Sequence, residues 1–152
     1  MLTKNDFCDY DTCVALKELG YNRGAYAYYF PNHKEDLIFN THQMRGCSIN
    51  EMLKGYNTYP KDVMGCEFID APTMWEAQKW LREEKDIDVL IKLECKDVYS
   101  SLKHYSVYLS YIGSFIRRFQ YLLDEFNSYE EALFEGIKIA VKILKEKLNE
   151  ET

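Results

Sequence analysis

The sequence predicts an α+β fold in which an antiparallel sheet of three or more strands carries two helices packed on one face. Three observations lead to this prediction. A helical pattern over residues 73–85 is followed directly by a strand pattern over 87–95. Two further strand patterns come next, and a long helical pattern ends the chain. An N-terminal helix and a β-hairpin are expected to extend this core.

The stretch from Ala71 to Leu93 contains a helix start, a helix end and a change of period. Thr73 and Glu76 form a capping box after Pro72, because each side chain can accept a backbone N–H of the first turn. The helix then has an apolar stripe made of Met74, Ala77 and Leu81, with Trp80 beside it. The strand alternates with a period of two, and its apolar side is Ile87, Val89, Ile91 and Leu93. We expect the helix to cover this side of the sheet.

Two more strands are predicted after this one. Residues 102–112 alternate, with Tyr105, Val107, Leu109 and Tyr111 on one side. Residues 115–123 alternate less regularly, and one face would carry Phe115, Arg117, Phe119, Tyr121 and Leu123. A helix over 115–126 remains an alternative, because Phe115, Phe119 and Leu122 also fit a period of 3.6.

The last helix is predicted over residues 128–148. Ser128 and Glu131 form a capping box at its start. Its apolar stripe consists of Tyr129, Ala132, Leu133, Gly136, Ile137, Ala140, Leu144 and Leu148. The small residues at 132, 136 and 140 would allow the helix to lie close against a sheet.

The N-terminal part predicts a short helix over 9–19, capped by Asp9 or Asp11 and ended by Gly20. A tyrosine-rich strand follows Gly24, and a turn at 31–33 leads to a returning strand at 37–39. Residues 40–70 predict a short helix over 49–55 and an extended segment over 66–69. This segment resembles an insertion or lid, where a functional site is often found.

Length and composition indicate one domain over residues 1–152, with an N-terminal part (1–70) and a core part (71–152). The net charge is −6 and is spread over both parts, so no basic arm is present to bind nucleic acid. Five cysteines without a CxxC pair, together with the absence of a signal peptide or membrane span, predict a cytoplasmic protein with reduced thiols.

The blocks APTMWEAQKWLREEKDIDV and SYEEALFEGIKIAVKIL, with ALKELGYN near the start, resemble a group of small uncharacterised proteins of phages, prophages and mobile elements of gut bacteria. The resemblance covers about two-thirds of the chain and is weakest over 40–68. It implies a phage or mobile-element context. The matching motifs are structural, so the resemblance transfers no catalytic residue.

The sequence lacks the motifs that are typical of metal sites, hydrolase active sites and nucleotide-binding loops. The three histidines and five cysteines do not form paired ligands, so we predict no metal and no cofactor. His104 and Ser106 share one strand face, but a cyclic-phosphodiester hydrolase would need a second His-x-Ser/Thr element, and we interpret the pair as part of an exposed polar face. The glycines form neither GxGxxG nor GxxxxGK, which argues against those nucleotide-binding loops.

The remaining hypothesis is a non-enzymatic accessory protein that acts through protein–protein contacts, including self-association. The expected contact residues are Trp75, Tyr108, Lys79 and Arg82, since an exposed tryptophan beside cationic side chains has the composition of a binding hot spot. A nucleic-acid- or nucleotide-associated module is the alternative, with Arg117, Arg118 and Lys103 as a small basic patch. A small enzyme with an unrecognised site in residues 40–70, near His33 or His42, is the second alternative.

Overall fold

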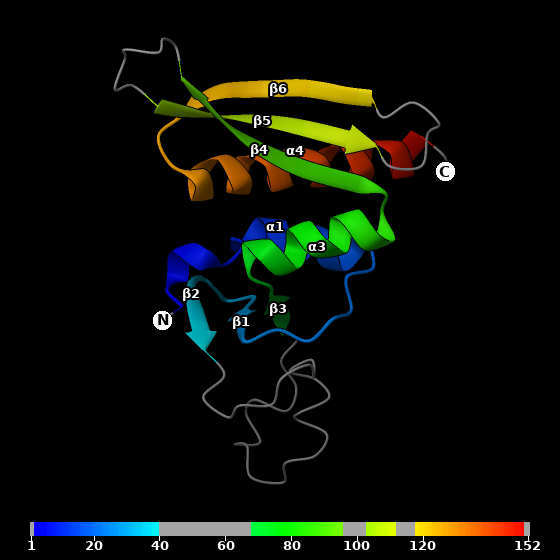
Figure 1. Ribbon diagram of the computed structural model, residues 1–152. Coiled ribbons are helices and arrows are strands. Elements are labelled where there is room, and N and C mark those ends of the chain that lie inside the picture. Colours follow the sequence, from blue (N-terminus) through cyan, green and yellow to red (C-terminus); the bar gives the residue numbers. More distant parts are fainter. Residues whose placement is uncertain (1, 40–67, 96–102, 112–117, 151–152) are drawn as a thin grey trace, which may run out of the picture. The chain divides into compact units, whose positions relative to one another are not determined.

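The computed structural model describes residues 2–39, 68–95, 103–111 and 118–150, and shows an α+β protein (Figure 1). The chain divides into two compact units, Met1–Thr73 and Met74–Thr152. Each unit has its own three-stranded sheet. The predicted helix over 49–55, His42 and the beginning of the extended segment over 66–69 lie outside the described residues.

The first unit contains the N-terminal helix and hairpin that the sequence predicts. A short 3-10 helix, η1 (Lys4–Asp6), precedes α1 (Tyr10–Glu18). The hairpin consists of β1 (Ala27–Phe30) and β2 (His33–Phe39), which pair antiparallel. A third strand, β3 (Ile69–Ala71), pairs antiparallel with the other side of β1, so that the order is β2-β1-β3.

Both ends of α1 are fixed by local hydrogen bonds. The Asp9 side chain accepts from the backbone N–H of Thr12 at 2.9 Å, so Asp9 rather than Asp11 is the N-cap. At the other end Gly20 has a φ of 96°, which a residue with a Cβ rarely adopts. Two bonds, Gly20 N–H to Lys17 O at 3.0 Å and Tyr21 N–H to Leu16 O at 2.8 Å, complete a Schellman motif.

One face of the first sheet packs beneath α1. Its buried residues are Ala27, Tyr29, Ile69 and Ala71. The Tyr29 hydroxyl donates to the carbonyl of Cys8 at 3.1 Å, which ties β1 to the start of α1. On the other face Tyr28, Phe30 and Phe68 form edge-to-face and tilted ring contacts with centroids 4.9–5.5 Å apart. The tyrosines of β1 therefore divide between the two faces of the sheet.

The second unit has the predicted order of helix, three strands and helix. These elements are α3 (Met74–Glu84), β4 (Ile87–Cys95), β5 (Lys103–Tyr111), β6 (Arg118–Phe126) and α4 (Tyr129–Glu150). The strands form an antiparallel sheet with β5 in the centre. Both helices lie on the same side of it, and Figure 1 shows α4 running along the sheet. None of the helices among the described residues is long and apolar enough to cross a bilayer.

The small residues of α4 allow a close approach to the sheet, as predicted. Ala132, Gly136 and Ala140 are all buried. A Cβ placed on Gly136 would lie 2.5 Å from Val89 Cγ1 and 2.9 Å from Val107 Cγ1. Half of the predicted capping box forms, because Glu131 N–H donates to Ser128 Oγ at 3.1 Å, whereas the Glu131 carboxylate accepts from Asn127 N–H at 3.3 Å.

The third strand differs from its prediction in position and register. Its described part, Arg118–Phe126, ends three residues later than expected, and the strand conformation there overturns the helical alternative for 115–126. Phe119 and Tyr121 pair with Ser110 and Tyr108, whereas Leu123 pairs with Val107. Two register shifts between β5 and β6 account for this difference, since a bulge inserts one residue and inverts the alternation beyond it. Phe115 and Arg117 of the predicted strand lie outside the described residues.

Helix α3 lies along the outer edge of β4. The Gln78 side chain donates from Nε2 to the carbonyl of Val89 at 2.6 Å. Arg82 Nε donates to Asp88 Oδ1 at 2.8 Å. The chain turns between helix and strand at Asp86, which has a φ of 55° and so occupies the left-handed region.

Candidate functional site

The two tryptophans of the chain lie on α3 and have opposite environments. Trp80 is 2% exposed and packs with Met74, Ala77 and Leu81 in the core. Trp75 is 41% exposed, so it is not part of this core. An exposed tryptophan is unusual, because burying its large ring is strongly favourable. Trp75 is therefore the most conspicuous side chain of the helix surface.

Lys79 and Arg82 lie on the same side of α3 as Trp75, four and seven residues further along. Lys79 Nζ is 3.8 Å from Glu83 Oε1, at the long end of the ion-pair range. Arg82 is fixed more firmly by its 2.8 Å contact with Asp88 on β4. The structure thus brings three of the four predicted contact residues together on one surface, which we call the α3 outer face (Trp75, Lys79, Arg82 and Glu83).

Tyr108, the fourth predicted residue, belongs to a different surface. It lies on the face of the sheet opposite to the helices, where its hydroxyl donates to Glu94 Oε1 at 2.8 Å. Lys92 Nζ is 3.1 Å from the same carboxylate oxygen. The hydrogen bond from Tyr108, followed by that from Lys92, lowers the pKa of Glu94, and the bond to Glu94 raises the pKa of Lys92. These three side chains form a connected polar cluster on the sheet face opposite to the helices.

His104 and Ser106 flank this cluster on β5, and the structure corrects one expectation about them. We expected an exposed polar face, but Ser106 is only 1% exposed and Ser110 is also buried. Both are short side chains in the central strand of the sheet. Ser106 Oγ makes no hydrogen bond with the residues that the structure describes.

The first unit contains a second group of titratable side chains, at the start of α1. Cys8 and Cys13 are buried thiols that form no disulfide, and the Cys13 thiol donates to the Cys8 carbonyl oxygen at 3.5 Å. Burial, reinforced by Cys8, Asp9 and Asp70, raises the pKa of Cys13. Burial also raises the pKa of Tyr29. Thiols held in the protonated form are poor nucleophiles and poor metal ligands, and both thiols are buried in the core of this unit.

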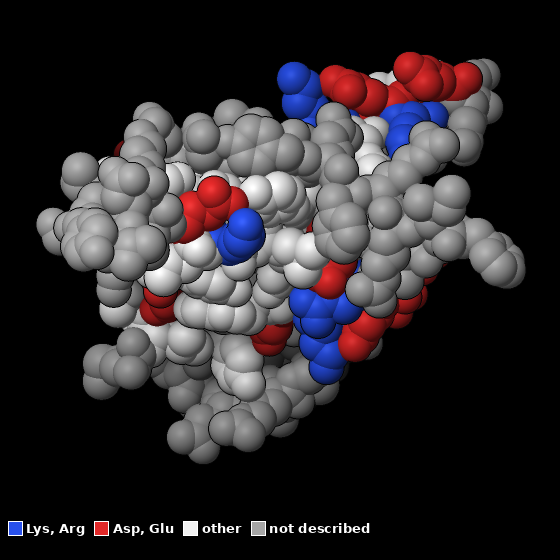
Figure 2. All heavy atoms as spheres, turned by 45° about the horizontal axis from the view of Figure 1, so that its top comes forward, with Lys and Arg blue, Asp and Glu red and all other residues white. Residues whose placement is uncertain are grey.

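Charged side chains do not separate by sign on the face that Figure 2 shows. Acidic and basic residues are mixed in small groups over the coloured part of that surface.

Among the described residues, no group of three or more His, Cys, Asp or Glu side chains is arranged to hold a metal ion. His33 and Lys103 are described by their backbone only, and residue 117 lies outside the described part of the chain.

Sequence reasoning missed one feature of the second unit. Leu93 continues the apolar alternation of β4, yet it is 46% exposed. The sequence indicates this exposure only in part: the charged residues Lys92 and Glu94 flank Leu93, and the end of a strand can extend beyond the helices that cover the sheet.

Comparison of the chain with models of protein families, with characterised proteins and with solved structures gives no significant match.

Proposed function

We propose that this chain is a non-enzymatic accessory protein of phage or mobile-element origin that acts by binding a protein partner through the α3 outer face. The observation that carries the proposal is the contrast between Trp80, which fills the core, and Trp75, which is left 41% exposed on the same helix. The sequence resemblance described above supports the phage or mobile-element context.

The surroundings of Trp75 fit a binding hot spot. Tryptophan and arginine are enriched among residues that dominate binding energy, and polar groups usually surround them. Arg82 is held in place by Asp88, so little side-chain entropy is lost when a partner contacts it. Lys79 and Glu83 supply a mixed-charge border that favours orientation over raw affinity.

The test compares three forms of the full chain as bait in an extract of a gut-bacterial host. Trp75→Ala removes the proposed anchor, and Leu148→Ala is the matched control, since Leu148 is also an exposed apolar residue on a helix of the second unit. We expect a partner that the wild type and Leu148→Ala retain and Trp75→Ala loses. With that partner purified, Trp75→Ala should weaken Kd by about 30-fold or more, as for a hot-spot residue.

Two outcomes would contradict the proposal. The first is that all three baits retain the same proteins with equal affinity. The second is that Trp75→Ala loses binding only together with its far-UV circular dichroism, while Trp75→Gln, a folded variant that also lacks the indole, binds the partner with the wild-type Kd.

A further inference from the structure

The outer edge of β4 has backbone groups available for pairing. Val89 O accepts a hydrogen bond from Gln78 on α3, so this carbonyl points away from β5. The pairing of β4 with β5 is regular over all nine residues, and backbone groups of every second residue point to the same side. The N–H and C=O groups of Ile91 and Leu93 therefore also point outward. No strand among the described residues pairs with this edge.

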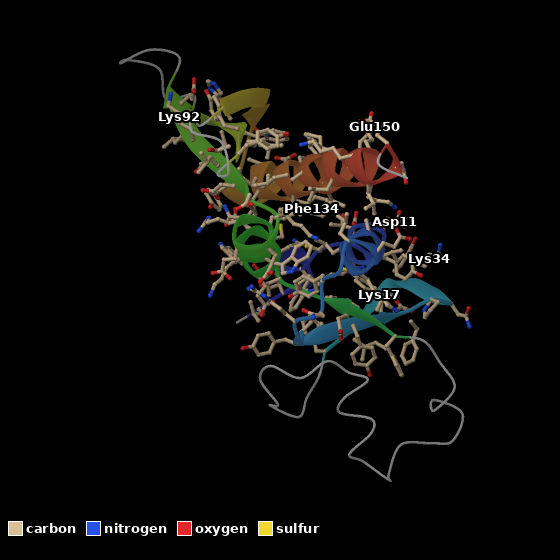
Figure 3. The ribbon with its side chains drawn as sticks, turned by 90° about the vertical axis from the view of Figure 1, so that its right-hand side faces the viewer. Asp11, Lys17, Lys34, Lys92, Phe134 and Glu150 are labelled. Carbon is tan, nitrogen blue, oxygen red and sulfur yellow. The ribbon has the colours of Figure 1, made fainter. Side chains whose placement is uncertain are left out.

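Helix α3 protects only the first part of the edge. Gln78 occupies the position of Val89, and Arg82 reaches Asp88 beside it. Figure 3 shows Lys92 further along the strand, on the part that leads away from α3. Leu93 in this second part is 46% exposed. An unprotected edge with an exposed apolar side chain is the usual requirement for adding another strand.

The charges beside Leu93 make this part of β4 complementary to itself. When two copies of the strand run antiparallel with their Leu93 residues opposite each other, Lys92 of each copy lies opposite Glu94 of the other. Directly opposite residues have Cβ atoms about 4.5–5.5 Å apart, which suits an ion pair. Lys92 and Tyr108 both contact Oε1 of Glu94, and Oε2 accepts no hydrogen bond from the described residues.

Neighbouring registers are unfavourable for reasons of charge. Centring the pair on Lys92 would place two lysines opposite each other. Centring it on Ile91 would place Asp88 opposite Glu94. Only the register centred on Leu93 combines outward-pointing backbone groups at the centre with opposite charges on both sides.

We propose that a second copy of this chain pairs with the outer edge of β4, antiparallel and centred on Leu93. The β4-β5-β6 sheets of the two copies would then form one continuous sheet. The strand's complementarity to itself is the reason to choose a second copy over another protein. The proposal goes beyond the function proposed above and does not depend on it, because the edge and the α3 outer face use different residues.

Sedimentation equilibrium of the full chain over a micromolar concentration range tests the proposal. The wild type is expected to dimerise. Lys92→Glu and Glu94→Lys should each weaken the dimer by about tenfold to a hundredfold, because each creates two like-charged cross-strand pairs. The double variant K92E/E94K restores opposite charges within and between copies, so its Kd should return to within about threefold of the wild type. Lys79→Glu on α3 is the control and should leave dimerisation unchanged.

A second variant blocks the edge without disturbing the fold. Leu93→Pro removes an N–H that points outward, so the bonds to β5 remain. It should be monomeric with an unchanged far-UV spectrum. The proposal is overturned if the wild type is monomeric at all concentrations, if the single charge variants dimerise as well as the wild type, or if the double variant does not recover. Trp75→Ala should dimerise normally, which separates this test from that of the proposed function.

Discussion

Gly136 offers the sharpest test of how α4 packs on the sheet. In an exposed helix Gly→Ala stabilises by about 1 kcal/mol, because alanine loses less backbone entropy on folding. At this position the new methyl group would lie 2.5 Å from Val89 Cγ1 and 2.9 Å from Val107 Cγ1. Both valines are fully buried and β-branched, so neither side chain turns easily out of the way.

The expected result is a loss of stability in spite of the better helix former. Overpacking of a filled core costs about 1–3 kcal/mol, and two close contacts place Gly136→Ala in the upper part of that range. After the gain in propensity, we expect a net loss of about 1–2 kcal/mol in the free energy of unfolding.

Urea unfolding followed by tryptophan fluorescence is the suitable assay. Both tryptophans of the chain belong to α3, so their emission reports on the second unit. Lys142→Gly measured against Lys142→Ala, at an exposed position of α4, gives the propensity difference without the packing effect. That difference should be about 1 kcal/mol in favour of alanine.

A double variant separates packing from other causes. Val89→Ala removes the closer of the two clashing groups, so Val89→Ala with Gly136→Ala should be less destabilised than the sum of the single variants by about 1 kcal/mol. The reasoning fails if Gly136→Ala stabilises the unit as much as alanine does at position 142.

Three further predictions concern the first unit. Tyr29→Phe removes the hydrogen bond to the Cys8 carbonyl and should lower the stability of this unit by about 1 kcal/mol, measured by hydrogen exchange of the α1 amides; unchanged exchange would contradict it. Gly20→Ala should also cost about 1 kcal/mol in thermal unfolding, entirely from backbone conformation, since no described atom beyond the two chain neighbours lies within 4 Å of the added Cβ; a neutral effect would refute the role of the left-handed turn. Stability should fall as the pH rises above 9.0, the ordinary pKa of the Cys13 thiol, because the unfolded chain releases a proton that the folded chain retains. The slope should be about 1.4 kcal/mol per pH unit for this group and should be absent in Cys13→Ala; equal slopes in both proteins would argue against it.

Local patterns were sufficient to predict most elements of the second unit. The strand over 87–95 was predicted with the bounds that β4 has, because its alternation is regular and its pairing contains no bulge. The helix start at Ser128 and the small residues of α4 could likewise be predicted, since each depends on residues three or four positions apart.

The parts that escaped prediction depend on contacts between distant segments. The bulges between β5 and β6 arise from pairing two strands, and the sequence of one strand does not encode where its partner gains a residue. The pairing of β1 with β3 joins residues about forty positions apart. The exposure of Leu93 follows from where α3 and α4 end their cover, and no local period records that limit.

The candidate site could likewise be predicted only where it depends on local patterns. That Trp75 lies off the apolar stripe followed from helical periodicity, and its exposure agrees with that. That Tyr108 lies on another surface than Trp75, joined to Glu94 and Lys92, required the register of β4 against β5. The burial of Ser106 required knowledge that β5 is the central strand.

The bond from Gln78 to Val89 has a consequence for aggregation. One amide side chain takes the place that a neighbouring strand would otherwise fill, so the first part of a nine-residue edge strand is shielded while the helix stays docked. Detachment of the helix would uncover the full length of that strand for unlimited stacking. We therefore expect conditions that loosen α3 to cause fibrous precipitation before the sheet itself melts.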